Sequence, residues 1–367
     1  MWGCDEVITE VRGRVGFITL NRPKALNALS LPMIRALAAT LLAWRDDPAV
    51  DAVAIRGSNK AGVFGAFCAG GDIRFFHQAV LRGDAELEDF FTEEYRLNHT
   101  IHTYPKPYIA FMDGIVMGGG MGISQGARLR IVTPRSKVAM PETNIGLFPD
   151  VGGGYFLSRC PGAAGEWLAL TGDVIDAATA LQLDLADTCF EAEKLQAAWD
   201  ALAQLPNHRA DTLAQWVASY SIAGYADTTM PNPEVNEFFA QGSAADMVKA
   251  LEASSSDWAQ ATAATLRTRS PLMMEVTLEL VRRARHMTLA QDLRLERDIV
   301  RHCFNTRHLN RFMADSETTE GIRALVIDKD NAPMWNPARV EEVTPEMVLP
   351  FFDSPWPAAE HPLKDLV

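Results

Sequence analysis

Short β-rich runs alternate with stretches of helical spacing along the first half of the chain. Strands are predicted over residues 15–20, 52–56, 108–112 and 128–132. Ser30 can cap a helix, because apolar residues recur at helical spacing from Ile34 to Leu42. The Asp-Asp-Pro run at 46–48 ends that helix. Strand–helix–strand alternation predicts an α/β fold in which crossover helices join parallel strands.

The second half of the chain is predicted to be mostly helical. Helices are predicted over residues 191–205, 247–266, 272–285 and 288–305, with Glu296 and Arg297 on the surface of the last one. The Pro- and Trp-rich end is predicted to be an irregular tail. We therefore expect two domains: an α/β core over residues 1–200, and a helical C-terminal region and extension over residues 201–367.

The net charge of −13 over 367 residues narrows the range of partners. Nucleic-acid binding needs a basic face, so no nucleic-acid partner is expected. The run from Pro107 to Ala127 is weakly charged, but it contains Asp113 and many glycines. It is predicted to be a core segment and not a membrane span, and no membrane partner is expected.

The five cysteines are widely scattered and show no Cys-x-x-Cys spacing. This pattern predicts neither a disulfide framework nor a zinc site, and it favours a reducing compartment. The first residues lack the pattern of a signal or transit peptide, so a cytoplasmic location is expected.

Residues 140–154 place two carboxylates, Glu142 and Asp150, eight positions apart among apolar residues, prolines and glycines. Each follows a proline, so neither is expected in the middle of a helix. Acidic residues are rarely buried without a partner or a task. Two interpretations stay open from these residues alone. They perform acid/base or nucleophilic chemistry, or they are one helix cap and one turn residue.

Three glycine-bearing segments carry further chemistry: residues 67–72, 117–124 and 142–154. Small residues let the backbone approach a ligand, and the first two segments can each open a helix whose unpaired N–H groups stabilise an oxyanion. A glycine cluster is also typical of a tight turn. The second segment does not show Gly-x-Gly-x-x-Gly followed by a ribose-binding acid, so no dinucleotide cofactor is predicted.

Taken in this order, the motifs resemble those of the crotonase, or enoyl-CoA hydratase/isomerase, superfamily. Residues 20–27 (Leu-Asn-Arg-Pro-Lys-Ala-Leu-Asn) resemble its first CoA-binding turn, and residues 69–72 and 118–120 resemble its two oxyanion-hole segments. This likeness spans residues 5 to 190. Residues 67–74, 93–95, 140–143, 145–156 and 320–330 are more closely similar to members that hydrolyse a short 3-hydroxyacyl-CoA thioester. The resemblance implies a crotonase-like ββα spiral core with a helical C-terminal region.

The resemblance also implies roles for individual residues. Glu142 and Asp150 match catalytic acids, and the backbone N–H groups of Ala69 and Gly119 match an oxyanion hole. Glu94 matches a further acid that contacts the substrate. The other residues implied in substrate binding are Gly70, Asp72, Gly118, Arg22, Lys24, Ala25 and Leu26, with Arg22 or Lys24 near the CoA phosphates. No metal or redox cofactor is implied, because CoA is part of the substrate.

One position departs from the hydratases of the superfamily. They carry a second glutamate two residues after the triple glycine, where this chain has Gly122. Adding water across a double bond needs two acid/base groups around one water, so the departure favours thioester hydrolysis. An isomerase, which needs a single glutamate, stays an alternative, as does a hydrolase of a different acyl-CoA. A non-catalytic CoA-binding protein is a lesser alternative.

The implied partner is an acyl-CoA substrate from valine breakdown. Glu142 either attacks the thioester carbonyl or activates a water, and Asp150 binds the 3-hydroxyl of the substrate or steers the second step. Many members assemble as trimers, so the resemblance allows a homo-oligomer. Cys68 and Tyr95 are predicted to be packing residues.

Overall fold

The computed structural model describes residues 4–225 and 233–367 and divides the chain into two compact units. The sheet unit comprises residues 1–71, 97–139 and 174–230. The helical unit comprises residues 72–96, 140–173 and 231–367. The predicted boundary near residue 200 lies after the last strand, whereas the observed units interleave along the chain. The reason is that the segments 72–96 and 140–173 pack with the C-terminal helices.

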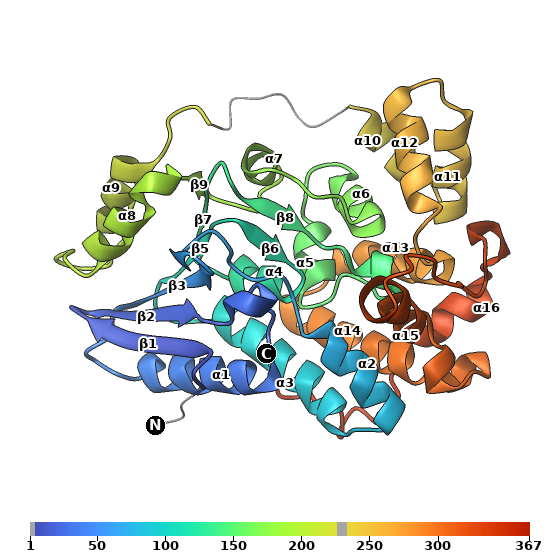
Figure 1. The fold of residues 1–367 in the computed structure, drawn as a ribbon, viewed down its shortest axis with the longest axis horizontal. Coiled ribbons are helices and arrows are strands. Elements are labelled where there is room, and N and C mark those ends of the chain that lie inside the picture. Colours follow the sequence, from blue (N-terminus) through green and yellow to red (C-terminus); the bar gives the residue numbers. More distant parts are fainter. Residues whose placement is uncertain (1–3, 226–232) are drawn as a thin grey trace. The chain divides into compact units, whose positions relative to one another are not determined.

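A seven-stranded sheet is the centre of the sheet unit (Figure 1). Its order is β1 (Val7–Arg12), β2 (Val15–Leu20), β3 (Ala52–Asn59), β5 (Tyr108–Met112), β7 (Leu129–Val132) and β9 (Thr188–Cys189), with β4 (Gly62–Val63) paired to β3. β1 is antiparallel to β2, and every later pair along the order is parallel. A separate parallel pair is formed by β6 (Ile115–Met117) and β8 (Lys137–Ala139). The four predicted strands and their parallel pairing are confirmed.

Aromatic side chains fill the space between this sheet and its helices. Phe17 of β2 lies 4.7 Å from Trp199, and Trp199 also contacts Phe111 of β5 at 5.1 Å between ring centroids. Burial of such large apolar surfaces is the main stabilising contribution in a domain of this kind. The helices of the sheet unit are α1 (Leu31–Arg45), α4 (Gly119–Gln125), α7 (Ala177–Gln182), α8 (Leu195–Leu202) and α9 (Ala210–Tyr220). Ser30 caps α1 by accepting the N–H of Met33, as predicted.

Helices make up the helical unit. They are α2 (Ile73–Arg82), the first part of α3 (Glu86–His102), α5 (Gly153–Leu157), α6 (Ala164–Thr171), α10 (Glu234–Phe239), α11 (Ala244–Ala253), α12 (Asp257–Leu266), α13 (Pro271–Ala284), α14 (Leu289–Phe304), α15 (Glu317–Ile322) and α16 (Pro345–Val348). Local signals explain two of the starts. Ser270 caps α13 ahead of Pro271, and Thr288 and Gln291 form a capping box on α14.

Two local predictions differ from the structure. The helical pattern over 247–266 contains a break, because Ser256 caps a new helix, α12, after α11 has ended. The prediction of Glu296 and Arg297 on the surface of α14 is wrong, since both are buried. Arg297 donates to Thr92 Oγ1 at 3.0 Å and pairs with Glu88, so α3 covers the face of α14 that the charges had suggested was exposed.

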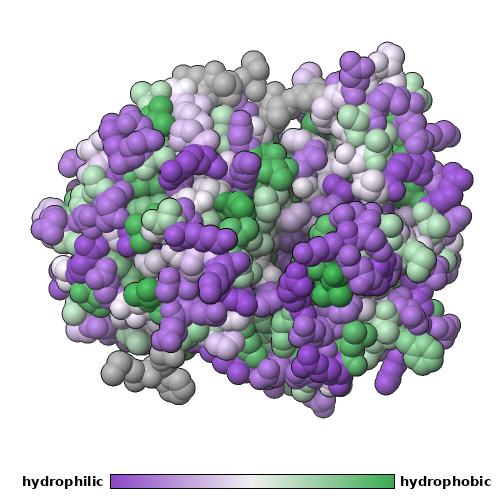
Figure 2. Space-filling model, viewed as in Figure 1, coloured by the Kyte–Doolittle hydropathy of each residue, from purple (hydrophilic) through white to green (hydrophobic). Residues whose placement is uncertain are grey.

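The visible surface of the protein is mixed in character. On the face shown in Figure 2, hydrophobic residues form small separate patches among hydrophilic ones. Within residues 4–225 and 233–367, no helix combines the length and the apolar character needed to cross a membrane. The possible homo-oligomer stays a prediction.

Candidate active site

The two oxyanion segments of the sheet unit run beside each other. Cys68 and Val116 form a parallel bridge, and the N–H of Met117 donates to the carbonyl oxygen of Cys68 at 2.9 Å. Because of this pairing, the backbone at Gly70 lies close to the backbone at Gly119. A Cβ atom placed on Gly70 would lie 3.8 Å from the Gly119 nitrogen. The structure therefore places side by side the two segments that the resemblance implies form one oxyanion hole.

Glycine is required at two positions of this arrangement. Gly118 has φ 49° and ψ −120°, a conformation that an L side chain would strain. Gly120 lies so near Cys68 that an added Cβ would overlap its carbonyl oxygen. The triple glycine therefore has a steric function: it lets the start of α4 approach the segment 67–71.

The N–H groups near the predicted oxyanion hole differ in whether they already have an acceptor. The N–H of Ala69 already donates to the carbonyl oxygen of Leu26 at 3.0 Å, so it is not available to a ligand in this structure. The N–H groups of Gly71 and Gly119 have no acceptor among the residues that the structure describes. An unpaired N–H in a site of small residues is the kind of donor that an oxyanion needs.

The predicted CoA-binding turn is held rigidly by one buried asparagine. Asn27 donates through Nδ2 to the carbonyl oxygens of Ser58, Ala66 and Phe67, and its Oδ1 accepts the N–H of Arg22. These bonds fix Pro23–Ala25 as a 3-10 turn (η1) and leave Leu26 42% exposed.

The charged residues of this turn differ in their availability. The Arg22 side chain pairs with Glu6 at 3.1 Å and donates to the Ala28 carbonyl, so it has structural partners. Lys24 is exposed and has no ion pair within the described part of the chain. Lys24 is therefore the better placed of the two predicted cations to meet a phosphate.

The predicted acids gather in the helical unit. Glu94 lies on α3, Glu142 begins the 3-10 turn Glu142–Ile145 (η2), and Asp150 precedes α5. Their side chains are buried, with 2%, 7% and 6% of their surface exposed. Tyr95 donates its hydroxyl to Asp150 Oδ2 at 2.8 Å. The prediction of Tyr95 as a packing residue therefore missed this hydrogen bond. Its position next to Glu94 was the only available signal.

Burial and mutual repulsion hold these acids toward their neutral forms. Burial, with the neighbouring charge of Asp150, raises the pKa of both Glu94 and Glu142 well above the usual range. Burial also raises the pKa of Asp150 to about 6, although the hydrogen bond from Tyr95 lowers it. Asp150 is thus the acid of this set that carries a negative charge most readily at neutral pH.

Two oxygen atoms of the cluster are buried without partners. Glu94 Oε1 and Glu142 Oε2 have no hydrogen-bond partner among the described residues. Buried carboxyl oxygens are normally satisfied, because an unmet one costs free energy. Such atoms are what a site keeps open for a substrate or a reacting water, which favours the chemical interpretation of residues 140–154 over a cap and a turn.

The turn that carries Glu142 is fixed from several sides. Thr143 donates its hydroxyl to the carbonyl oxygen of Leu170 at 3.0 Å, and Thr318 donates to that of Gly146 at 2.6 Å. Gly146 has φ 64° and lies against Glu317, where a side chain would overlap the backbone. Glu142 therefore stands on a rigid support, as a nucleophile or base requires.

Other predicted residues have structural tasks. Asp72 caps α2 by accepting the N–H of Phe75 at 3.3 Å. Gly122 lies in the buried helix α4, so a second acid is indeed missing after the triple glycine. Within the described residues, no group of three or more His, Cys, Asp or Glu side chains could hold a metal ion.

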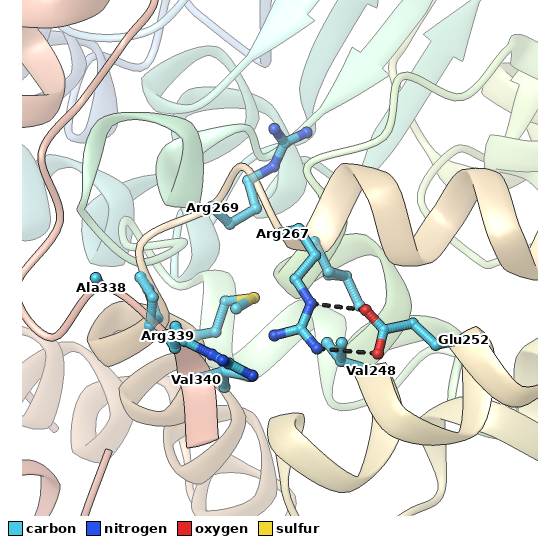
Figure 3. A pocket seen from close by; sticks show the side chains of 10 residues that line it. Val248, Glu252, Arg267, Arg269, Ala338, Arg339 and Val340 are labelled. Carbon is cyan, nitrogen blue, oxygen red and sulfur yellow. Dashed lines mark hydrogen bonds and ion pairs between the residues drawn. The ribbon is translucent and has the colours of Figure 1, made fainter. Parts of the chain in front are cut away.

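A separate cavity of about 390 Å³ in the helical unit is lined by three arginines, Glu252 and six apolar residues (Figure 3). Arg267 forms ion pairs with Glu252 at 2.8 Å and with Glu341 at 2.7 Å. Arg269 donates to the carbonyl oxygen of Thr171 at 2.8 Å. Arg267 and Arg269 are therefore both engaged by protein partners in this cavity.

Comparisons with known proteins identify the family of the chain. The family model described as enoyl-CoA hydratase/isomerase matches residues 15–352. The 3-hydroxyisobutyryl-CoA hydrolase of Danio rerio, named as mitochondrial, is 38% identical over 355 residues, which cover 95% of this chain and 90% of that protein. The Homo sapiens hydrolase of the same name is 35% identical over 349 residues, covering 94% and 87%.

Solved structures give the same family under different names. A carnitinyl-CoA dehydratase from Mycobacterium thermoresistibile has a TM-score of 0.86 and 35% identity, covering 99% of both chains. An enoyl-CoA hydratase from Rhodobacter sphaeroides 2.4.1 has a TM-score of 0.81 and 34% identity, covering 95% of this chain and 98% of that one. The predicted crotonase-like fold is confirmed. This chain belongs to the enoyl-CoA hydratase/isomerase family.

Proposed function

We propose that the protein hydrolyses the thioester of 3-hydroxyisobutyryl-CoA to 3-hydroxyisobutyrate and free CoA, a reaction of valine breakdown. The observation that carries this proposal is the acid set Glu94, Glu142 and Asp150, buried together with unpartnered oxygens while position 122 is glycine. Two curated relatives with this activity in their names match nearly the whole chain.

Different residues contribute to different steps of this reaction. The thioester carbonyl oxygen becomes negative in the transition state, and the N–H groups of Gly71 and Gly119 stabilise it. This replaces Ala69, whose N–H is engaged by Leu26. No metal or redox group is proposed, because the substrate brings the CoA itself.

In one route Glu142 attacks the carbonyl carbon, the C–S bond breaks and CoA leaves as a thiol, and water then cleaves the resulting mixed anhydride to give the acid and restore Glu142. In the other route Glu142 removes a proton from a water that attacks the carbonyl carbon, and the C–S bond breaks to release the acid and the CoA thiol. Both routes need its carboxylate form, and because burial raises the pKa of Glu142, that carboxylate is a stronger base than an exposed one. Asp150, oriented by Tyr95, binds the 3-hydroxyl of the substrate or steers the second step. Glu94 contacts the same acyl group.

Hydration is the main alternative, since the solved relatives carry the names of a dehydratase and a hydratase. Gly122 argues against it, because the water lacks a second acid/base group on α4. An isomerase would use Glu142 alone and would leave Asp150 and Glu94 without a task. A non-catalytic CoA-binding protein would have no use for the unpartnered carboxyl oxygens of Glu94 and Glu142.

A substrate panel read by release of free thiol tests the proposal. We expect rapid release of CoA from 3-hydroxyisobutyryl-CoA and slower release from isobutyryl-CoA, which lacks the hydroxyl. Crotonyl-CoA is followed by loss of its conjugated absorbance, which reports hydration. Faster hydration of crotonyl-CoA than hydrolysis of the hydroxyacyl thioester would contradict the proposal. Cytoplasmic location stays a prediction, and the two named relatives are mitochondrial.

A further inference from the structure

Two fully buried acids on α14 lie against the turn that follows Asp150. Glu296 and Asp292 are each 0% exposed. Neither has an ion pair with an arginine or lysine in the described part of the chain. Burying acids without a cation is costly unless other groups satisfy them, so their partners decide why they are present.

The partners are backbone N–H groups of the Asp150 turn, defined as residues 150–155. Gly152 donates to Glu296 Oε2 at 2.8 Å, and Gly154 donates to Glu296 Oε1 at 3.1 Å. Tyr155 donates to Asp292 Oδ2 at 2.8 Å. These N–H groups stand at the start of α5, where a helix has no acceptors of its own. The Glu296 carboxyl group thus accepts hydrogen bonds from two N–H groups of the turn, and the Asp292 carboxyl group accepts one from a third.

The backbone of this turn is strained directly after Asp150. Val151 has φ 58°, a conformation that a β-branched residue rarely adopts. Gly152 follows with φ 89°, and the N–H of Gly153 returns to the carbonyl oxygen of Asp150 at 2.8 Å. Such strain persists only where the surroundings fix it, and it clusters at functional sites. The two acids hold the backbone that directly follows Val151.

The charge state of the pair suits this task. Burial, together with the Asp292 carboxylate, raises the pKa of Glu296 well above the usual range. Burial raises the pKa of Asp292 to about 6. Burial and the repulsion between the two carboxylates therefore disfavour a state in which both acids are charged. The charged groups around it are Asp150, which also raises the pKa of Glu296, and Arg159, which lowers that of Asp292.

We propose that Glu296 and Asp292 are positioning residues that hold the Asp150 turn, and with it the Asp150 carboxylate, in the orientation at which Tyr95 binds it. The inference rests on the proposed function, which gives Asp150 its contact with the substrate. Neither acid touches the substrate. They act through the backbone of residues 152–155.

Glu296→Gln is the test variant, because it keeps the size of the side chain but presents an NH2 group to one of two N–H donors. Asp298→Asn is the matched control on the same helix. Asp298 is also buried, but it accepts from Ser354 at 2.8 Å and lies 3.3 Å from His361 of the tail. Both variants are first compared by thermal unfolding.

The kinetic readout is a double-mutant cycle with Asp150→Asn, measured as kcat/KM for 3-hydroxyisobutyryl-CoA. We expect Glu296→Gln to lower kcat/KM by about 10- to 100-fold in the native background, because misplacing a reacting group by an ångström has effects of this size. In the Asp150→Asn background we expect Glu296→Gln to lower kcat/KM by less than about threefold, because the effects of substitutions at coupled residues do not add. Equal losses in both backgrounds would mean a merely structural role and would overturn the proposal.

Hydrogen exchange gives a readout that does not depend on the reaction. We expect the amides of Gly152, Gly154 and Tyr155 to exchange faster in Glu296→Gln than in the native protein and in Asp298→Asn. Unchanged exchange of these amides would overturn the proposal. If Asp150→Asn alone kept the full rate, the proposed role of Asp150 would fail, while the exchange data would still show whether Glu296 holds the turn.

Discussion

The sheet unit and the helical unit provide their chemistry in opposite ways. The sheet unit offers backbone N–H groups, at Gly71 and Gly119, positioned by strand pairing and by the absence of side chains. The helical unit offers side chains, Glu94, Glu142 and Asp150, whose properties depend on burial and on partners from distant helices. A donor made from backbone is insensitive to most substitutions, whereas a buried acid responds to every neighbour. The comparison predicts where substitutions will have sharp effects.

The largest effect is expected at the acid that performs the chemistry. Glu142→Gln keeps the shape but removes the carboxylate, so we expect kcat to fall by about 10³-fold, within the range for general acid–base groups. Release of CoA from 3-hydroxyisobutyryl-CoA measures it, and a native-like unfolding temperature shows that the fold is intact. Near-native turnover would remove Glu142 from the mechanism.

A substitution to a residue other than proline can remove a backbone N–H donor from the site only by moving the backbone itself. Gly120→Ala places a Cβ against the Cys68 carbonyl oxygen and pushes the two oxyanion segments apart. We expect about a 10²-fold loss of kcat, comparable to losing one oxyanion donor elsewhere. Gly242→Ala is the control, because its nearest neighbour would be Asp246 Oδ2 at 3.5 Å. If Gly120→Ala behaved like this control, the segments would not need their close approach.

Tyr95→Phe removes one hydrogen bond to Asp150 and leaves all the acidic side chains in place. The Tyr95 hydrogen bond lowers the pKa of Asp150, which is about 6, so its removal raises that pKa. If the carboxylate form of Asp150 is the active one, activity is lost as pH falls through its pKa, and the acid limb of the kcat/KM profile moves to higher pH. We expect a roughly tenfold loss at pH 6 and a smaller loss at pH 8. A profile of unchanged shape would show that Asp150 does not titrate in the reaction.

The smallest effect is expected at the exposed CoA turn. Lys24→Ala removes a solvent-exposed cation, so we expect KM to rise about three- to fivefold at low salt and less at high salt, as for exposed ion pairs. Lys60→Ala, an exposed lysine in the β3–β4 turn, is the control. An equal change in both variants would indicate only a general effect of net charge.

Much of the sheet unit could be predicted from sequence because its signals are local. The four strands and the helix capped by Ser30 follow from periodicity and capping, which act within a few residues. The glycine segments were recognisable for the same reason. The Ala69 N–H was assigned as a donor because a motif does not show that Leu26, more than 40 residues earlier, already accepts its hydrogen bond.

The helical unit was less predictable because its important contacts are distant in sequence. Glu296 lies 144 residues from the Gly152 N–H that it accepts, and it has the helical spacing of a surface residue. Tyr95 and Asp150 are 55 residues apart. No periodicity encodes such pairs, since each partner has an ordinary local environment.

The sequence by itself determined the type of strands and helices, the location of the glycine segments, the acids available for chemistry and the missing glutamate at Gly122. Those properties depend on covalent structure and local sterics. Only the tertiary structure decided which N–H groups stay unpaired, which carboxyl oxygens lack partners and how far burial raises each pKa. These depend on water exclusion and on neighbours brought together by folding, which are properties of the packed molecule and not of any one segment.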